Sequence, residues 1–102
     1  MRIIMNILDL PLKAKWYNMI ESGIKKEEYR EMKPYWYKRL CIPSPNEKLT
    51  FKHINYVRFR YGYTKNTMMF KIDSITTGKG NTGWGAPKDK NVFIIKFGGK
   101  IK

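Results

Sequence analysis

The sequence predicts a single α+β domain in which a mostly antiparallel sheet curls into a small β-barrel with two flanking helices. The chain has 102 residues, enough for one domain with one modest core. Hydrophobic residues make up 42% of it and aromatic residues 15%, which favours a folded domain over a disordered one. The predicted elements run strand, helix, strand, helix and then three strands, an order typical of α+β folds. We expect the domain to span residues 1–102 without a linker.

The first strand and the first helix are predicted within residues 3–23. Residues 3–8 are apolar enough to form a buried strand. Pro11 suits the first turn of the helix, because the N–H that proline lacks would have no partner there. Gly23 stands where a left-handed cap would end the helix. The apolar residues of this helix recur at helical spacing and are expected to pack in the core: Leu12, Trp16, Met19 and Ile20.

The next two elements are a strand over residues 25–32 and a short helix over residues 35–40. Alternation along the strand places Glu28 and Arg30 on one face and Tyr29 on the other. A proline between the two elements ends the strand.

Three further strands are predicted in the second half of the chain. They cover residues 55–61, 68–76 and 91–97. Residues 42–46 and the glycine-rich residues 78–87 have the composition of loops.

The charge balance is the strongest indication of function. The 21 Lys and Arg residues against 8 Asp and Glu residues give a net charge of +13 and an isoelectric point of about 10.0. A domain this basic suits an anionic polymer, and its many aromatic residues favour RNA or another nucleic acid. The alternatives are a charge that serves solubility, or a basic patch that meets an acidic protein or a membrane surface.

Cys41 is the only cysteine and His53 the only histidine. No disulfide can form within the chain, which fits a reducing compartment, and a Cys/His zinc site lacks ligands. A Ser-His-Asp triad would depend on His53 alone. The sequence shows neither a signal peptide nor a stretch of transmembrane length. We therefore expect a cytoplasmic protein without metal, cofactor or membrane partner.

Residues 78–83 match the dinucleotide-binding pattern GxGxxG, but their surroundings do not. That motif needs a helix directly after it, whose N-terminus holds the pyrophosphate. Residues 84–87 include glycine and proline and cannot begin a helix, so the pattern indicates a loop that needs positive φ angles. A loop that carries Lys79 and Trp84 could still wrap a polynucleotide.

Residues 23–30 carry a more informative pattern. Gly23, Lys25, Glu28 and Arg30 match the fixed positions of GxKxxExR, the signature of the ASCH domain. The surroundings are also similar: an apolar helix before the motif, the strand 57–60, the segment 81–87 and a final apolar strand. Over nearly its whole length the chain resembles ASCH proteins of the PUA-like superfamily, in particular the small ones of bacteria and their phages.

This resemblance implies a small PUA-like β-barrel with helices at its side and a cleft lined by the motif. Members are generally thought to bind RNA, by analogy with PUA domains. Some remove the acetyl group of acetylated cytidine, and ribonuclease activity has been ascribed to others. The resemblance therefore implies an RNA-binding module, with an amidohydrolase or a ribonuclease as the alternative.

The side chains of the motif suit a nucleotide. Lys25 and Arg30 offer a point charge and a planar donor to phosphate or to a base carbonyl. Glu28 is acceptor-only when ionised and suits an exocyclic amine or a ribose hydroxyl. The alternative is that these three residues form a structural ion-pair network.

The same residues would carry catalysis in an enzyme. The acetylcytidine-cleaving members use a lysine, a threonine and a glutamate; Lys25 matches the lysine, but Glu28 stands in place of the threonine. The hydroxyl nucleophile is thereby lost, and a carboxylate beside Lys25 opposes the lowered pKa that a lysine base needs. Glu28 could instead act as a base on water.

A second basic and aromatic surface is predicted around residues 55–61. Alternation turns Val57 and Phe59 toward the core, and Arg58 and Arg60 outward or into a polar cleft. The further residues expected to contact nucleic acid are Tyr63, Lys65, Lys79 and Trp84. The alternative for the two arginines is a solvated sheet face, and a third possible function is docking of the basic face on an acidic protein.

Overall fold

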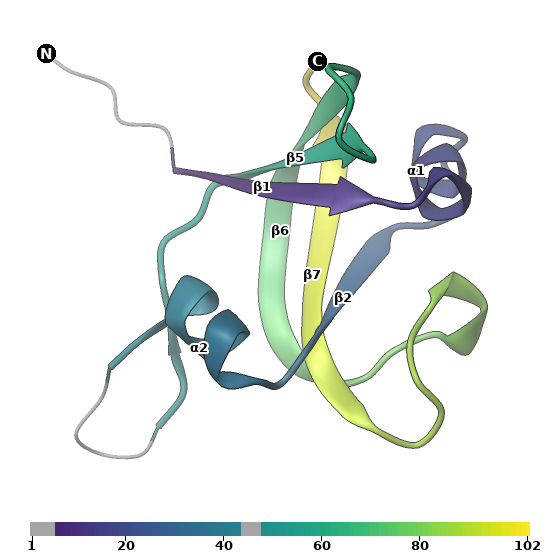
Figure 1. The fold of residues 1–102 in the computed structure, drawn as a ribbon. Coiled ribbons are helices and arrows are strands. Elements are labelled where there is room, and N and C mark those ends of the chain that lie inside the picture. The colour runs from purple at the N-terminus through teal and green to yellow at the C-terminus, as the bar shows by residue number, and fades with distance from the viewer. Residues whose placement is uncertain (1–5, 44–47) are drawn as a thin grey trace, which may run out of the picture.

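The computed structural model describes residues 6–43 and 48–102. At its centre is a five-stranded sheet with the strand order β1-β5-β6-β7-β2 (Figure 1). Strand β1 pairs with β5 in parallel, and all other neighbours pair antiparallel. The strands are β1 (Ile7–Leu12), β2 (Glu27–Glu31), β5 (Tyr56–Tyr61), β6 (Thr67–Lys79) and β7 (Asn91–Lys100). The other elements are α1 (Ala14–Glu21), α2 (Pro34–Leu40), the 3-10 turn η1 (Thr82–Trp84), and a small sheet of β3 (Cys41–Ile42) and β4 (Thr50–Phe51).

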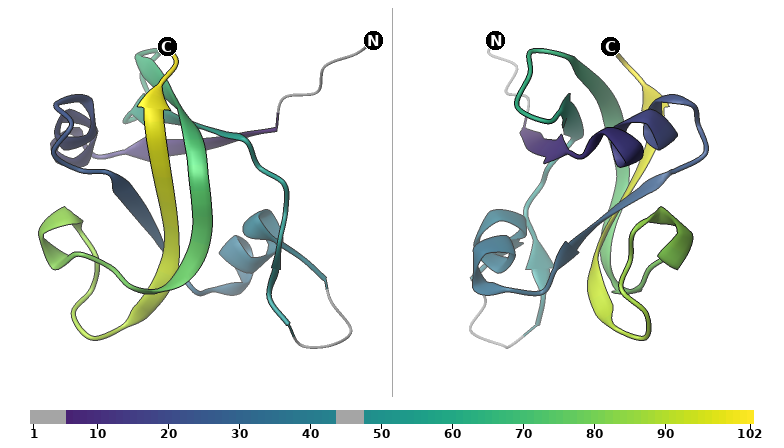
Figure 2. Two further views of the ribbon diagram at one scale, coloured as in Figure 1. Left: turned by 180° about the vertical axis from the view of Figure 1, so that it is seen from behind. Right: turned by 45° about the vertical axis from the view of Figure 1, so that its right-hand side comes forward.

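The sheet is strongly curled but open. The long strands β6 and β7 bend along their length, and β1 and β5 run across them near one end (Figures 1 and 2). The pairing of β6 with β7 shifts on either side of Ile72, and such irregularities bend a strand and increase its twist. Strands β1 and β2 form the edges and are not paired with each other within the described residues. The predicted α+β fold with a mostly antiparallel sheet and two helices is confirmed, but the predicted barrel is a half-barrel.

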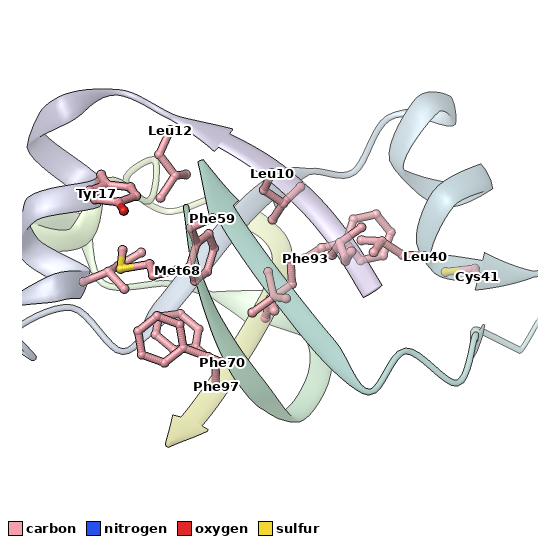
Figure 3. Packing of buried hydrophobic residues seen from close by; sticks show 14 residues of the cluster. Leu10, Leu12, Tyr17, Leu40, Cys41, Phe59, Met68, Phe70, Phe93 and Phe97 are labelled. Atoms are coloured by element: carbon pink, nitrogen blue, oxygen red, sulfur yellow. The ribbon is translucent and has the colours of Figure 1, made fainter. Parts of the chain in front are cut away.

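The main hydrophobic core lies inside the curl of the sheet (Figure 3). The rings of Phe59 and Phe97 pack edge to face there, with their centroids 5.0 Å apart. Helix α1 adds Tyr17 and Ile20 to the core, and α2 adds Leu40. A smaller cluster of Tyr29, Ala86 and Val92, with Trp84 and Ile94 packed against it, fastens the loop after β6 to the sheet.

The beginning of the chain differs from the prediction. Residues 3–5 lie outside the described residues, and Pro11 belongs to β1, so the prediction that Pro11 begins a helix is wrong. Because β1 is an edge strand, the N–H that proline lacks interrupts no ladder. The helix begins at Ala14 instead, and Gly23, with φ of 86°, follows its end in the predicted left-handed conformation.

In the second half of the chain the elements form where they are predicted, with different ends. Strand β6 extends through Gly78 to Lys79, so the glycine-rich loop begins later than predicted and contains the turn η1. The pairing of β3 with β4 is not predicted, because two residues per strand give no alternation. Residues 44–46 of the predicted loop lie outside the described residues. No helix in the described part of the chain has the length and hydropathy needed to cross a membrane.

Candidate functional site

Lys25, Glu28 and Arg30 come together at the free edge of β2. Glu28 Oε1 lies 3.2 Å from Lys25 Nζ, and Glu28 Oε2 lies 3.2 Å from Arg30 Nη2. Glu28 and Arg30 stand opposite the core residues Ile95 and Phe93 of β7, so they share one face as predicted. The Lys25 side chain is fully buried, whereas that of Glu28 is 7% exposed and that of Arg30 20%. The three side chains form an ion-pair network in which Lys25 is enclosed by protein and Arg30 is partly exposed to solvent.

Lys25 lies beneath the loop that follows β6. Its ammonium group donates to the backbone carbonyl of Trp84 and lies 5.1 Å from the ring centroid of Trp16 and 4.9 Å from that of Tyr29. Burial lowers the pKa of Lys25 from its usual value; the opposing effect of the Glu28 carboxylate is present, as expected from the sequence, but it is smaller. Lys25 therefore contacts protein groups on all sides rather than an open surface.

Arg30 bridges the two edge strands of the sheet. Its Nη2 also donates to the backbone carbonyl of Pro11 in β1 at 3.4 Å, where the strands themselves are not paired. The guanidinium carbon lies 5.2 Å from the ring centroid of Trp36 in α2. Arg30 Nε is buried and has no acceptor among the described residues. An unpaired buried donor costs about 1–3 kcal/mol, so this N–H lowers the stability of the site.

Two adjoining cavities lie beside this network. The inner cavity has a volume of about 280 Å³, and the outer cavity has a volume of about 670 Å³. Together they reach the size of clefts that bind small molecules. The inner cavity is lined chiefly by Lys13, Trp16, Glu28, Tyr29, Arg30 and Trp84. The outer cavity is lined chiefly by Lys13, Arg30, Glu31, Trp36, Lys90 and Val92.

The loop after β6 forms one wall of both cavities and is held by close packing. The Tyr29 hydroxyl accepts a hydrogen bond from the backbone N–H of Asn81 at 2.9 Å. A Cβ on Gly80 would lie 2.6 Å from the Tyr29 ring, and a Cβ on Gly85, where φ is 104°, would lie 3.0 Å from Trp16. Close packing thus accounts for Gly80 of the GxGxxG pattern, and the prediction of positive φ angles is wrong for Gly80 and Gly83. The last two residues of the pattern belong to the three-residue turn η1, and no α-helix follows in the rest of the chain, all of which the structure describes.

We expect the pKa of the Tyr29 phenol to lie well above that of an ordinary tyrosine. Burial raises the pKa of Tyr29 to about 12. The N–H of Asn81, which donates to the phenol oxygen, lowers this pKa, and Glu27, which accepts a hydrogen bond from the hydroxyl at 2.8 Å, raises it by a smaller amount. Alkaline ultraviolet titration of the protein and of Tyr29→Phe should give a difference curve for one phenolate with a midpoint of about 12. A midpoint at the ordinary value of 10.0, with circular dichroism showing a folded protein, would contradict the buried position of Tyr29.

The outer face of β5 holds a separate cluster. Arg58 donates twice to Asp9 of β1, from Nε at 2.7 Å and from Nη2 at 3.3 Å. Arg60 lies 4.0 Å from the same carboxylate and donates to the Thr64 carbonyl at 3.0 Å in the turn after β5. Both arginines point outward as predicted, and Asp9 offsets part of their charge. No ion pair among the described residues joins this cluster to the network around Glu28.

The remaining predicted binding residues lie near the two ends of β6. Tyr63, which is 94% exposed, and Lys65 belong to the turn between β5 and β6, and Lys79 is exposed at the other end of β6 (Figure 1). Of the predicted binding residues, the structure thus gathers four around the inner cavity: Lys25, Glu28, Arg30 and Trp84.

Several residues that line the cavities are not predicted as site residues from the sequence. Helical periodicity assigns Trp16 to the core, but Tyr17 takes the buried position and Trp16 lines the inner cavity. Tyr29 and Glu28 face opposite sides of β2, yet both line the inner cavity, because it lies beyond the free edge of that strand. Lys90 carries no sequence signal beyond its charge.

The two residues considered for metal or nucleophile chemistry lie elsewhere. Cys41 is buried in the main core, and His53 is exposed between β4 and β5. No group of three or more His, Cys, Asp and Glu side chains that could hold a metal ion occurs within residues 6–43 and 48–102.

Comparison of the chain with models of protein families, with curated proteins and with solved structures finds no match. Membership of the ASCH family therefore stays a prediction from the motif of residues 23–30 and its setting.

Proposed function

We propose that the protein is a cytoplasmic RNA-binding module of the ASCH type, within the PUA-like superfamily, and that one nucleotide occupies the inner cavity. One observation carries the proposal: the ion-pair network of Lys25, Glu28 and Arg30 ends at a cavity lined by aromatic rings and by cations. The gathering of the motif side chains at one place supports a common role for them.

The inner cavity offers the two kinds of interaction that single-stranded nucleic acid needs. The rings of Trp16 and Trp84 supply stacking surfaces, worth about 1–3 kcal/mol per base. Lys13 and the open side of Arg30 supply positive charge for a phosphate. Glu28 Oε2 accepts from Arg30 and has capacity for one further donor, such as an exocyclic amine or a ribose hydroxyl.

Lys25 does not touch the nucleotide in this proposal. Its side chain is fully buried, so it acts as a positioning residue that holds Glu28 and the Trp84 backbone in place. The ion-pair network and the binding site, considered as alternatives from the sequence, are then parts of one structure.

A longer RNA would also reach the outer face of β5. Arg58 and Arg60, with Tyr63 and Lys65 in the following turn, would contact its phosphates, and such contacts position a strand without selecting a base.

We expect the affinity for a long single-stranded RNA of mixed sequence to fall steeply with salt, because each contacted phosphate releases counterions. The double variant Arg58→Ala/Arg60→Ala should reduce the slope of log Kd against log salt by about 1.4, since one phosphate contact contributes about 0.7 in single strands. Fluorescence anisotropy at a series of salt concentrations measures this slope. Lys38→Ala/Lys48→Ala removes the same charge from exposed positions near α2 and should change the slope less.

Two results would contradict RNA binding. One is an affinity that is equal at low and at physiological salt. The other is a purified protein that carries an acidic protein partner and no nucleic acid.

An enzyme acting on RNA or on an acetylated nucleoside is the second candidate, and the lowered pKa of Lys25 favours it, since a lysine base needs such a shift. Lys25 Nζ is enclosed, however, so a substrate would reach it only after movement of the loop that follows β6. Incubation with acetylcytidine and with RNA separates the candidates. Product that disappears in Lys25→Ala and in Glu28→Gln would favour catalysis over binding alone.

A further inference from the structure

We infer that the cleft binds two successive nucleotides of single-stranded RNA, with the first base in the inner cavity and the second nucleotide in the outer cavity. This inference rests on the proposed function and extends it to residues outside the sequence motif. The second position would be formed by Trp36 and Lys90, with Lys13 and Arg30 between the two positions.

The two cavities share a boundary. Lys13, Tyr29, Arg30 and Gly85 line both of them, so a ligand in one cavity lies next to the other. The inner cavity, at about 280 Å³, lies at the lower end of the volumes of small-ligand sites, whereas the outer cavity has about 670 Å³. The continuous cleft is therefore larger than a single base requires.

The charges of the outer cavity favour a phosphate. Lys13, Arg30 and Lys90 contribute positive charges to its lining, against one carboxylate, that of Glu31. Glu31 pairs with Lys33 at 3.2 Å and, more distantly, with Lys90 at 3.9 Å. Since Lys33 is not among the lining residues, the three cations of the lining keep an excess of positive charge over this one carboxylate. Lys13 and Arg30 stand at the boundary between the cavities, where the phosphate that joins two nucleotides would lie.

The outer cavity also has apolar surface for a second base or its ribose. Trp36, Val92 and Pro87 line it. The Arg30 guanidinium lies 5.2 Å from the Trp36 ring centroid, and guanidinium planes as well as aromatic rings stack against unpaired bases.

The length dependence of binding tests the inference. We expect the adenylate dinucleotide to bind at least about tenfold more tightly than adenosine monophosphate, because it gains one stacked base and contacts in the outer cavity. Adenylates of three and six residues should gain much less over the dinucleotide. Calorimetric titration measures these affinities, and the uridylate series shows whether the same step occurs with another base.

A matched pair of lysine variants locates the second position. Lys90→Gln should weaken the affinity for the dinucleotide by about two- to fivefold, which is the effect of one exposed ion pair. The affinity for adenosine monophosphate should stay unchanged. Lys88→Gln removes the same charge from an exposed position nearby that lines neither cavity, and it should change neither affinity.

The outcomes separate this inference from the proposed function. Equal affinities for the mononucleotide and the dinucleotide, both reduced by Trp84→Ala, would overturn the two-nucleotide site and leave the single-nucleotide proposal standing. Absence of binding to all adenylates, all uridylates and long RNA would overturn both.

Discussion

Lys25→Met is expected to lower the free energy of unfolding by about 3 kcal/mol or more, because removing one partner of a buried ion pair leaves the other uncompensated. Methionine keeps much of the length of the side chain but takes one of two cations from Glu28, whose side chain is 7% exposed, and leaves the Trp84 carbonyl without its donor. In denaturant the midpoint should fall at an unchanged slope, and the thermal midpoint should drop by at least about 12 °C.

Lys26→Met is the matched control, since the neighbouring lysine is exposed, and it should stay within about 0.5 kcal/mol of the parent protein. The double variant Lys25→Met/Glu28→Gln should recover part of the loss, because the amide removes the buried carboxylate, while Arg30, which also loses its ion pair, has a side chain that is 20% exposed to water. Should Lys25→Met unfold at the same denaturant concentration as Lys26→Met, Lys25 would have no structural role in the site.

The orientation of single strands could be predicted from the sequence because alternation is a local property of the backbone. It places Glu28 with Arg30 on β2, and it turns Arg58 and Arg60 away from the core on β5; the observed ion pairs agree with both. The signature of residues 23–30 likewise identifies three side chains that meet in the structure.

Contacts between distant segments could not be predicted in this way. The carbonyl above Lys25 belongs to Trp84, 59 positions later in the chain, and its place depends on the path of the loop after β6. Periodicity identifies the apolar stripe of α1 but not its centre. A rotation of about 100°, one residue of an α-helix, decides whether Trp16 or Tyr17 enters the core.

Closure of the barrel also depends on information that element order does not contain. Pro11 has no N–H that could donate to a partner strand on the free side of β1. Its carbonyl accepts a hydrogen bond from the Arg30 side chain of β2 and not from a backbone N–H. The edges consequently stay apart, and residues of β1 and β2 line the inner cavity that lies between them. The same departure from a closed barrel thus provides the space that the proposed function requires.

Trp84→Ala is expected to weaken the binding of a six-residue adenylate by about five- to 150-fold, because stacking a base on an aromatic ring is worth about 1–3 kcal/mol. The half-buried side chain lines the inner cavity, while Lys25 contacts only the backbone carbonyl of this residue. The substitution therefore removes the ring and leaves the ammonium contact available. Fluorescence anisotropy with the labelled adenylate measures the loss.

Two further variants distinguish loss of a ring in the cavity from general damage. Trp84→Phe keeps an aromatic face and should retain most of the affinity. Tyr63→Ala removes a ring that is 94% exposed in the turn after β5, and it should leave the affinity for this short RNA within about twofold. Since Trp84 also packs against Tyr29 and Val92, thermal unfolding must show Trp84→Ala folded at the temperature of the titration. Equal weakening by Trp84→Ala and Tyr63→Ala would place the base outside the inner cavity, because only one of the two rings lines it.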